Sequence, residues 1–226
     1  MDPSTGPRAR SIASFRAEDP VRHAGASRRA GGRSRIGVLA LQGAFGAHRA
    51  RLADLGVEAP EVRRPADLVG IDALVMPGGE STTMSTLLTS SGLFDELKAR
   101  ISDGLPVFGT CAGMILLATE VHHGRPDQRS FGALDITVQR NGYGRQLESF
   151  ETDLDVDGLD GPFHSVFIRA PRVESVGPAV EVLARHQDDA VLVREGRIMA
   201  AAFHPELTDD HRLHAAFVEL VEQGES

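Results

Sequence analysis

The chain of 226 residues has little cysteine: Cys111 is its only one, so no intrachain disulfide can form. Small secreted domains depend on several such bridges, and the cysteine content therefore gives no support to a secreted, disulfide-stapled fold. A free thiol fits a reducing compartment. The chain also lacks any apolar run approaching the roughly 18 residues that a membrane-spanning helix needs. We therefore expect a cytoplasmic protein without a membrane segment.

Positive charge is scarce over most of the chain. The formal net charge is −8, although residues 1–35 carry eight arginines against three acids, a net of +5. Residues 36–226 therefore carry −13, which argues against nucleic acid as a partner of the folded part. Residues 1–35 are rich in Ser, Gly, Ala and Arg, without an apolar period. We expect a disordered Arg-rich extension there, either a passive tail, a transit peptide or an arm for acidic surfaces, before a single domain at 36–226.

The first half of the folded part alternates short apolar runs with segments of helical period. Apolar runs of this length are typical of buried parallel strands. We expect strands at 36–41, 57–62, 71–76 and 105–108, and helices at 44–55, 82–88, 94–101 and 114–118. Alternation with short connections predicts a parallel sheet that is covered by helices on both faces.

The second half has a different pattern, in which short strands follow one another through turns. We expect strands at 131–138, 149–156, 163–169, 180–186, 190–194 and 197–203, and a closing helix at 209–221. The whole domain is therefore predicted to be a three-layer α/β fold. Its central sheet is mostly parallel, with helices on both faces and an antiparallel strand extension in the second half.

The single cysteine lies where a predicted strand gives way to a predicted helix, in the run Gly109-Thr110-Cys111-Ala112-Gly113. We expect the flanking glycines to permit a sharp turn and a close approach of substrate. A thiol at a helix N-terminus also has its thiolate favoured by the helix dipole and the free amides. The position favours a nucleophile that attacks an acyl or amide carbon. The alternative is a small buried hydrophobic residue.

A thiol nucleophile needs a base, and the base needs an acid that orients it. His204-Pro205-Glu206 follows an apolar strand, and the carboxyl ends of strands are where functional groups of open α/β sheets gather. Pro205 favours an extended His204, and residues i and i+2 of an extended chain point to the same side. We therefore predict a triad of Cys111, His204 and Glu206. The alternative for the pair is a polar turn with solvated side chains.

Two further turns follow predicted strands. The run from Pro77 to Ser81 contains Gly78-Gly79 and leaves backbone amides free between a strand and a helix. Such amides hold a substrate carboxylate or stabilise an oxyanion. The lysine of a phosphate-binding loop is missing. Gln42-Gly43 ends another strand and is placed to line the same crevice, although a plain βα turn explains either motif by itself.

Six short runs form a combined signature. They are 37–43 (GVLALQG), 77–83 (PGGESTT), 108–113 (FGTCAG), Arg140-Asn141 with 144–146 (GRQ), 167–171 (FIRAP) and 203–208 (FHPELT). Together they resemble the glutaminase subunits of pyridoxal 5′-phosphate synthase, a family within the triad (class I-type) glutamine amidotransferases. The cysteine and His-x-Glu runs are shared with the wider class, whereas GGESTT and IRAP are narrower. The resemblance extends from about residue 36 to the C-terminus.

The resemblance implies a flavodoxin-like amidotransferase fold and hydrolysis of L-glutamine to L-glutamate and ammonia through a thioester on Cys111. It implies that His204 protonates the departing ammonia and that Glu206 orients His204. The glutamine-binding residues that it implies are Gly79, Glu80, Ser81, Arg140, Ile168 and Arg169. The residues that it implies as oxyanion support are Gln42, Gly78 and Ala112. It implies no cofactor and no metal.

The resemblance also implies a partner. In the family, ammonia passes to a (β/α)₈-barrel synthase subunit within a large hetero-oligomer that makes pyridoxal phosphate. Such a barrel takes about 250 residues, more than this chain offers beside a glutaminase. We therefore expect L-glutamine and that synthase as partners, with no nucleic acid and no membrane.

The residues by themselves leave three alternative functions open. The chain is compatible with a glutaminase subunit of another amidotransferase, such as imidazole glycerol phosphate synthase, with a cysteine peptidase on a related fold, and with a non-catalytic binding subunit. The other histidines give no metal site: His122-His123 falls in a predicted polar loop, and the pair His211 and His214, one helical turn apart, has no identifiable third ligand.

Overall fold

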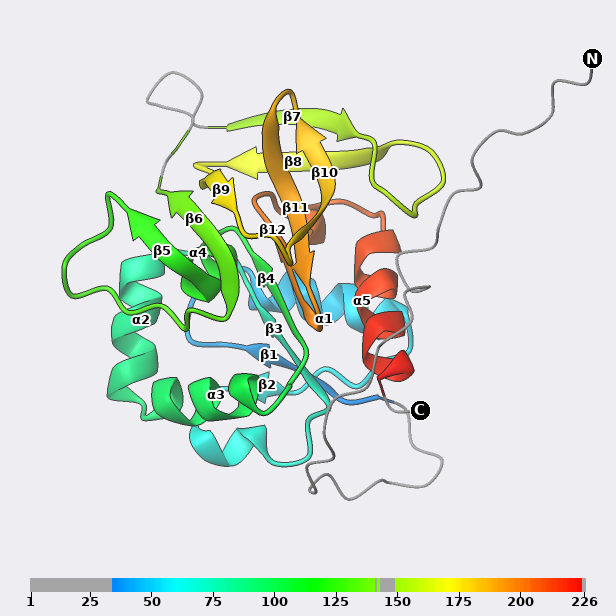
Figure 1. The fold of residues 1–226 in the computed structure, drawn as a ribbon. Coiled ribbons are helices and arrows are strands. Elements are labelled where there is room, and N and C mark those ends of the chain that lie inside the picture. The colour runs from blue at the N-terminus through cyan, green and yellow to red at the C-terminus, as the bar shows by residue number, and fades with distance from the viewer. Residues whose placement is uncertain (1–33, 141, 143–148, 225–226) are drawn as a thin grey trace, which may run out of the picture.

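A seven-stranded sheet forms the centre of the molecule (Figure 1). The computed structural model describes residues 34–140, 142 and 149–224, so the predicted extension at 1–35 lies outside the described residues except for its last two. The strand order is β10-β11-β12-β4-β3-β1-β2. The strands are β1 (Ile36–Leu39), β2 (Glu61–Val62), β3 (Ala73–Met76), β4 (Val107–Thr110), β10 (Glu181–His186), β11 (Asp189–Glu195) and β12 (Ile198–Ala201).

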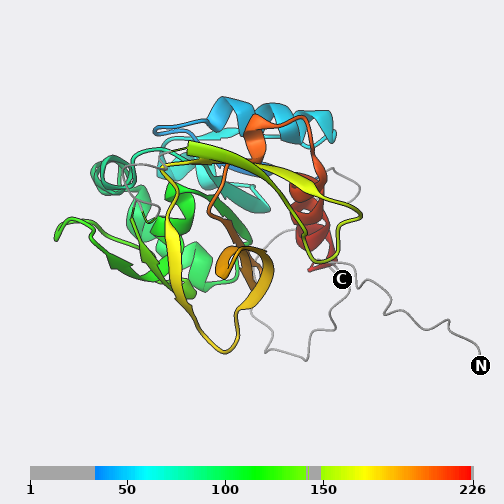
Figure 2. The ribbon, with the colours of Figure 1, turned by 90° about the horizontal axis from the view of Figure 1, so that it is seen from above.

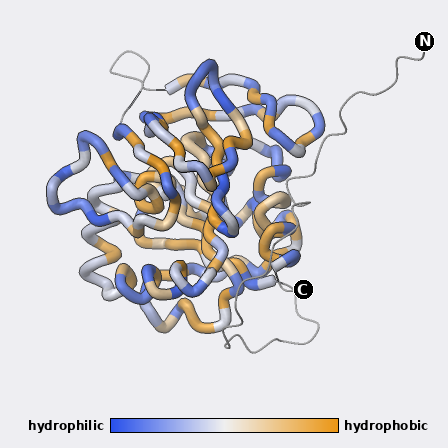
Figure 3. The backbone as a smooth tube through the Cα atoms, in the orientation of Figure 1, coloured by the Kyte–Doolittle hydropathy of each residue, from blue (hydrophilic) through white to orange (hydrophobic). Residues whose placement is uncertain are grey.

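The five strands from β12 to β2 run parallel, and β11 pairs with both β12 and β10 in the antiparallel sense. The predicted sheet, mostly parallel with an antiparallel extension, is therefore confirmed. Strands β1, β3 and β4 are buried along their whole length. Figure 3 shows the same pattern, with hydrophobic segments in the central strands and hydrophilic segments in the outer loops. Burial on both faces explains why these strands read as continuous apolar runs.

Helices cover both faces of the sheet (Figures 1 and 2). Helices α1 (Phe45–Asp54) and α5 (Arg212–Gln223) lie on one face. Helices α2 (Ser81–Ser90), α3 (Leu93–Ser102) and α4 (Ala112–Leu117) lie on the other. Neighbouring residues of a strand point to opposite faces, and β4 shows this directly. The ring of Phe108 lies 5.6 Å from that of Phe217 in α5, whereas Gly109 packs against α4.

Two small sheets flank the antiparallel edge. One contains β5 (Ala118–His122), β6 (Leu134–Gln139) and β9 (Arg172–Val176), and the other is the hairpin of β7 (Ser149–Leu154) and β8 (Phe163–Ile168). The short 3₁₀ helices are η1 (Pro65–Leu68) and η2 (Pro205–Leu207). Among the helices of the described part, none has the length and apolar character to cross a bilayer.

Strands β5 and β9 were not predicted. The predicted loop at His122-His123 is wrong for His122, which is the last residue of β5. Helix α4 ends at Leu117, and Ala118 turns at once to an extended ψ of 147°. The β-branched Thr119 and Val121 favour the strand that follows.

Candidate active site

Cys111 occupies a sharp turn between β4 and α4. Its φ is 48° and its ψ is −102°, a conformation that residues with a side chain rarely adopt. The Cys111 amide donates to the carbonyl of Ala201 over 2.8 Å, which fixes the turn to the end of β12. The residue is 6% exposed. This geometry is that of a nucleophile elbow at the carboxyl edge of a parallel sheet.

The flanking glycines do not make the sharp turn, as we had expected them to. Neither Gly109 nor Gly113 has a positive φ, so the sharp turn is made by Cys111 itself. A Cβ on Gly113 would lie 2.2 Å from the carbonyl oxygen of Met76, and one on Gly109 would lie 2.8 Å from the carbonyl carbon of Gly113. The glycines therefore let α4 pack closely on β3 and β4, because any side chain at these positions would collide with backbone atoms.

His204 and Glu206 meet Cys111 at this edge. The Nδ1 atom of His204 lies 2.8 Å from Oε1 of Glu206, and the His204 imidazole is close enough to Cys111 for the thiol group to raise its pKa. Both residues of the pair are buried, at 8% and 3% exposure. A Cβ on Gly78 would lie 2.3 Å from Cε1 of His204 and 3.3 Å from Cβ of Cys111. Sulfur, imidazole and carboxylate therefore meet beside the glycine turn.

The route by which Glu206 reaches His204 differs from the prediction. We expected an extended chain, but Pro205–Leu207 form the 3₁₀ helix η2, with His204 as its N-cap at φ −112° and ψ 84°. Proline favours the first turn of a helix because it has no N–H to satisfy there. The tight turn, and not a strand, brings the carboxylate back to the imidazole.

The site favours a protonated His204. Burial lowers the pKa of His204, but hydrogen bonds with Cys111 and Glu206, together with the charges of these groups, outweigh burial and raise the pKa to about 10. Burial raises the pKa of Glu206, while the neighbouring imidazoles of His48 and His204 lower it by more. At neutral pH an imidazolium therefore stands between the sulfur and an ionised carboxylate.

The glycine turn is held by Gln42. Its Oε1 accepts a hydrogen bond from the Glu80 amide over 3.0 Å, and the Ala44 amide donates to the carbonyl of Gly78 over 3.3 Å. Gly79 is exposed, with space for a Cβ limited by Gln42. The two turns at the ends of β1 and β3 are therefore in contact, and their lining of one crevice stays a prediction.

Glu80 caps helix α2 and pairs with Arg140. Its carboxylate accepts from the amides of Thr82 and Thr83 over 3.1 and 2.7 Å, and its Oε1 lies 2.7 Å from a guanidinium nitrogen of Arg140. Burial raises the pKa of Glu80, but the hydrogen bonds from Thr83 and Thr82 and the charge of Arg140 outweigh it and lower the pKa to about 2. A pocket of about 500 Å³ opens here, lined among others by Glu80, Thr82, Thr83, Arg125 and Arg140.

The other predicted binding residues take different positions. The carbonyl of Ile168 lies 3.9 Å from the Cys111 sulfur, so the end of β8 reaches this thiol. Arg169 follows with a φ of 45° and an exposed side chain. Ser81 is 2% exposed, and its hydroxyl has no hydrogen-bond partner within the part of the chain that the structure describes.

Three residues near the triad were not predicted to have a role: His48, Thr110 and His214. His48 is fully buried on α1, with Nε2 at 3.3 Å from Oε2 of Glu206. It also contacts Thr110 and His214, at 3.1 and 3.0 Å. The sequence signal that could have indicated His48 is a titratable side chain on the apolar face of the helix predicted at 44–55. His211 and His214 do not converge, since His214 faces His48 while His211 lies 3.9 Å from Asp54.

The SNO glutamine amidotransferase family matches residues 38–223. The chain belongs to this family. It is 56% identical to the pyridoxal 5′-phosphate synthase subunit PdxT of Frankia alni over 193 residues, which are 85% of this chain and 97% of the relative. It is 57% identical to the PdxT subunit of Mycobacteroides abscessus over 189 residues, 84% of this chain and 98% of the relative.

Solved structures agree with the sequence comparison. A crystal structure described as a glutamine amidotransferase superimposes with a TM-score of 0.79 at 54% identity, covering 83% of this chain and 98% of the other. A putative GMP synthase protein from Thermoplasma acidophilum shares the fold at a TM-score of 0.61 and 18% identity, covering 86% of this chain and 96% of the other. The family resemblance of the six motifs is confirmed.

Proposed function

We propose that this chain is a glutaminase that hydrolyses L-glutamine to L-glutamate and ammonia, and that it serves a pyridoxal 5′-phosphate synthase. The observation that carries the proposal is the meeting of Cys111, His204 and Glu206 at the carboxyl edge of the sheet. Relatives that share more than half of their residues with this chain are named as subunits of that synthase.

The proposed reaction begins with attack of the Cys111 thiolate on the side-chain amide carbon of glutamine. The tetrahedral intermediate that forms places negative charge on the former carbonyl oxygen, and the backbone amides of Ala112 and of the Gly78-Gly79 turn stabilise it. The carbon–nitrogen bond then breaks, and His204 gives its proton to the departing nitrogen, so that ammonia leaves. Water attacks the thioester with His204 as base, which releases glutamate, frees the sulfur of Cys111 and returns the proton to His204.

Substrate binding is proposed for Gly79, Glu80, Ser81, Arg140, Ile168 and Arg169. The zwitterionic end of glutamine needs an anionic and a cationic partner, and Glu80 and Arg140 provide both signs beside the pocket. Gln42 supports the turn that holds the oxyanion amides. No metal or cofactor takes part in this reaction scheme.

The proposed partner is a (β/α)₈-barrel synthase subunit in a large hetero-oligomer. Free ammonia is protonated at neutral pH and loses its nucleophilicity, so direct transfer between subunits preserves its reactivity. A thiol nucleophile functions in a reducing compartment, and we propose the cytoplasm.

The test is ammonia release from L-glutamine by the wild type and by Cys111→Ala, each with and without the synthase subunit. We expect release by the wild type, with glutamate in equal amount, and none above background by Cys111→Ala with an unchanged melting temperature. Full release by Cys111→Ala would remove the assignment of the nucleophile. Failure of the reconstituted complex to form pyridoxal phosphate from glutamine, a pentose phosphate and a triose phosphate would remove the assignment of the pathway.

A further inference from the structure

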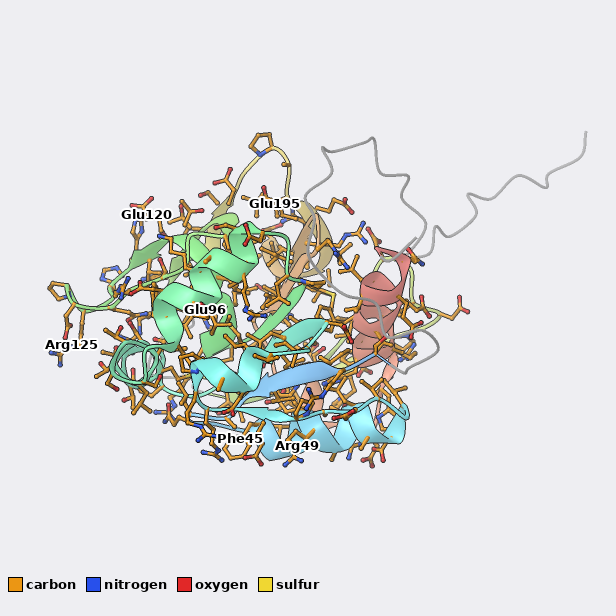
Figure 4. All side chains as sticks on the ribbon, turned by 90° about the horizontal axis from the view of Figure 1, so that it is seen from below. Phe45, Arg49, Glu96, Glu120, Arg125 and Glu195 are labelled. Atoms are coloured by element: carbon orange, nitrogen blue, oxygen red, sulfur yellow. The ribbon has the colours of Figure 1, made fainter. Side chains whose placement is uncertain are left out.

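A buried chain of imidazoles lies behind the triad, on the side away from Cys111. Helix α1, on which Figure 4 labels Phe45 and Arg49, carries the fully buried His48 on the side that faces the core. His48 and His214 are both 0% exposed, and the two side chains connect α1 with α5. The reaction scheme above uses neither residue, although burying two titratable side chains is costly.

The contacts lead from α5 to the triad. Nε2 of His214 lies 3.0 Å from Nδ1 of His48. Nε2 of His48 lies 3.1 Å from the hydroxyl oxygen of Thr110 and 3.3 Å from Oε2 of Glu206. The other oxygen of Glu206 holds His204. Oε2 is buried and has no hydrogen-bond partner among the described residues, whereas His48 Nε2 bonds Thr110 and lies 3.3 Å from Oε2. The interaction of His48 with this oxygen is therefore electrostatic, with Nε2 beside an ionised carboxylate.

Both imidazoles are neutral at pH 7. Burial lowers the pKa of His48, more than the charge of Glu206 raises it. Burial and the neighbouring His48 hold the pKa of His214 at about 3. Each ring therefore carries one proton, and the geometry decides on which nitrogen it lies.

One assignment of the protons is the more favourable one. With a proton on Nε2, His48 donates toward Thr110 and Glu206, and its Nδ1 accepts from Nε2–H of His214. The opposite assignment would bring a lone pair of His48 to 3.3 Å from the carboxylate. It would also leave a buried N–H at Nδ1 of His214, an atom without a hydrogen-bond partner in the described part of the chain. That arrangement is unfavourable, because it leaves the buried N–H of His214 unpaired and turns a lone pair of His48 toward the carboxylate.

We propose that His48 is a positioning residue of the active site: its Nε2–H, 3.3 Å from the second oxygen of Glu206, stabilises the charge on that oxygen, and His214 fixes the tautomer of His48. This role rests on the proposed function, in which Glu206 orients His204. With the charge on one oxygen stabilised by His48, the carboxylate keeps its other oxygen on Nδ1 of His204. An imidazole in that orientation directs its remaining nitrogen to Cys111.

The first experiment is independent of turnover. Long-range ¹H–¹⁵N NMR spectra of the full chain with ¹⁵N-labelled histidine report which ring nitrogen carries the proton. We expect both His48 and His214 to be protonated on Nε2 at pH 7, with assignments from His48→Gln and His214→Gln. Protonation of His48 on Nδ1 would overturn the proposal, whether or not the chain is a glutaminase.

The second experiment measures glutamine hydrolysis by the complex with the synthase subunit. His48→Leu removes the donor, whereas the amide of His48→Gln keeps one near the position of Nε2. We expect kcat of His48→Leu to fall about tenfold with KM unchanged, less than the about 10²–10⁴-fold contribution of an acid–base group itself. We expect His48→Gln to recover most of kcat.

The matched control is His211→Leu, which changes a histidine one helical turn from His214 without entering the network and leaves kcat unchanged. Equal kcat in His48→Leu and the wild type would overturn the positioning role, as would equal losses in a folded His48→Gln and His48→Leu. Absence of ammonia release from the wild-type complex itself would instead count against the proposed function. If His48→Leu does not fold, the spectra and His48→Gln still decide.

Discussion

At the scale of single residues, the backbone of Cys111 is the most constrained feature of the site. A side chain at φ 48° and ψ −102° costs about 1–3 kcal/mol, and the surrounding strands impose that cost. The hydrogen bond from the Cys111 amide to Ala201 fixes this backbone conformation, together with the close packing of α4 over Gly109 and Gly113. The strain places the sulfur at the edge of the sheet, where His204 and Ile168 reach it.

Because of this strain, we predict that glycine stabilises the fold more than alanine does at position 111, the reverse of their order inside a helix. Because glycine adopts positive φ without a steric cost, we expect Cys111→Gly to unfold with a free energy about 1 kcal/mol higher than Cys111→Ala. At the next residue, in α4, the sign reverses, and Ala112→Gly should lose about 1 kcal/mol relative to the wild type. Urea unfolding of the three variants measures both differences. A Cys111→Gly variant less stable than Cys111→Ala would show that the turn is not strained.

The protonation of His204 predicts a stability that depends on pH. Its pKa in the folded protein, about 10, lies above the ordinary 6.5, so the contribution of its partners is complete below pH 6.5 and is lost as pH rises through about 10. We expect the difference in free energy of unfolding between the wild type and His204→Gln to be larger at pH 7 than at pH 10. Denaturant titrations at the two pH values measure this difference. A difference independent of pH would contradict the raised pKa.

At the scale of elements, close packing of α4 on the sheet predicts unequal effects of the same substitution. A Cβ at position 113 meets the carbonyl of Met76 at 2.2 Å, so Gly113→Ala should cost about 1–3 kcal/mol. The control is Gly46→Ala in α1, where a Cβ meets no atom within 4 Å. Removing a helical glycine there should stabilise by about 0.5–1 kcal/mol. Thermal and urea unfolding measure both, and equal effects at the two positions would show that α4 has room to move.

The elements themselves differ in how well the sequence predicts them. The inner strands of the central sheet carry apolar runs that their burial explains, and they were predicted within a few residues. Strand β9 was missed because only Val173 in it is buried, so no alternation marks it. Strand β5 was missed because its alanine and histidine read as the end of a helix and the start of a loop.

At the scale of the whole molecule, the fold and the proposed site lie within the described residues from 34 onward. We propose that residues 36–226 are the glutamine amidotransferase domain. Removal of residues 1–33 should therefore leave the melting temperature within about 2 °C and glutamine hydrolysis unchanged. Calorimetry and ammonia release by the truncated chain measure both. A markedly lower melting temperature would show that the first residues stabilise the domain.

The fold class followed from the sequence because periodicity and turn chemistry are local properties of the chain, and the six motif runs indicated the family. The triad of Cys111, His204 and Glu206 stays a prediction from the same runs. The tertiary structure alone decided which distant side chains meet. The pairing of Glu80 with Arg140 spans 60 positions, and that of His48 with His214 spans 166. No local period encodes such contacts, since they exist only once strands and helices pack and remove these groups from water.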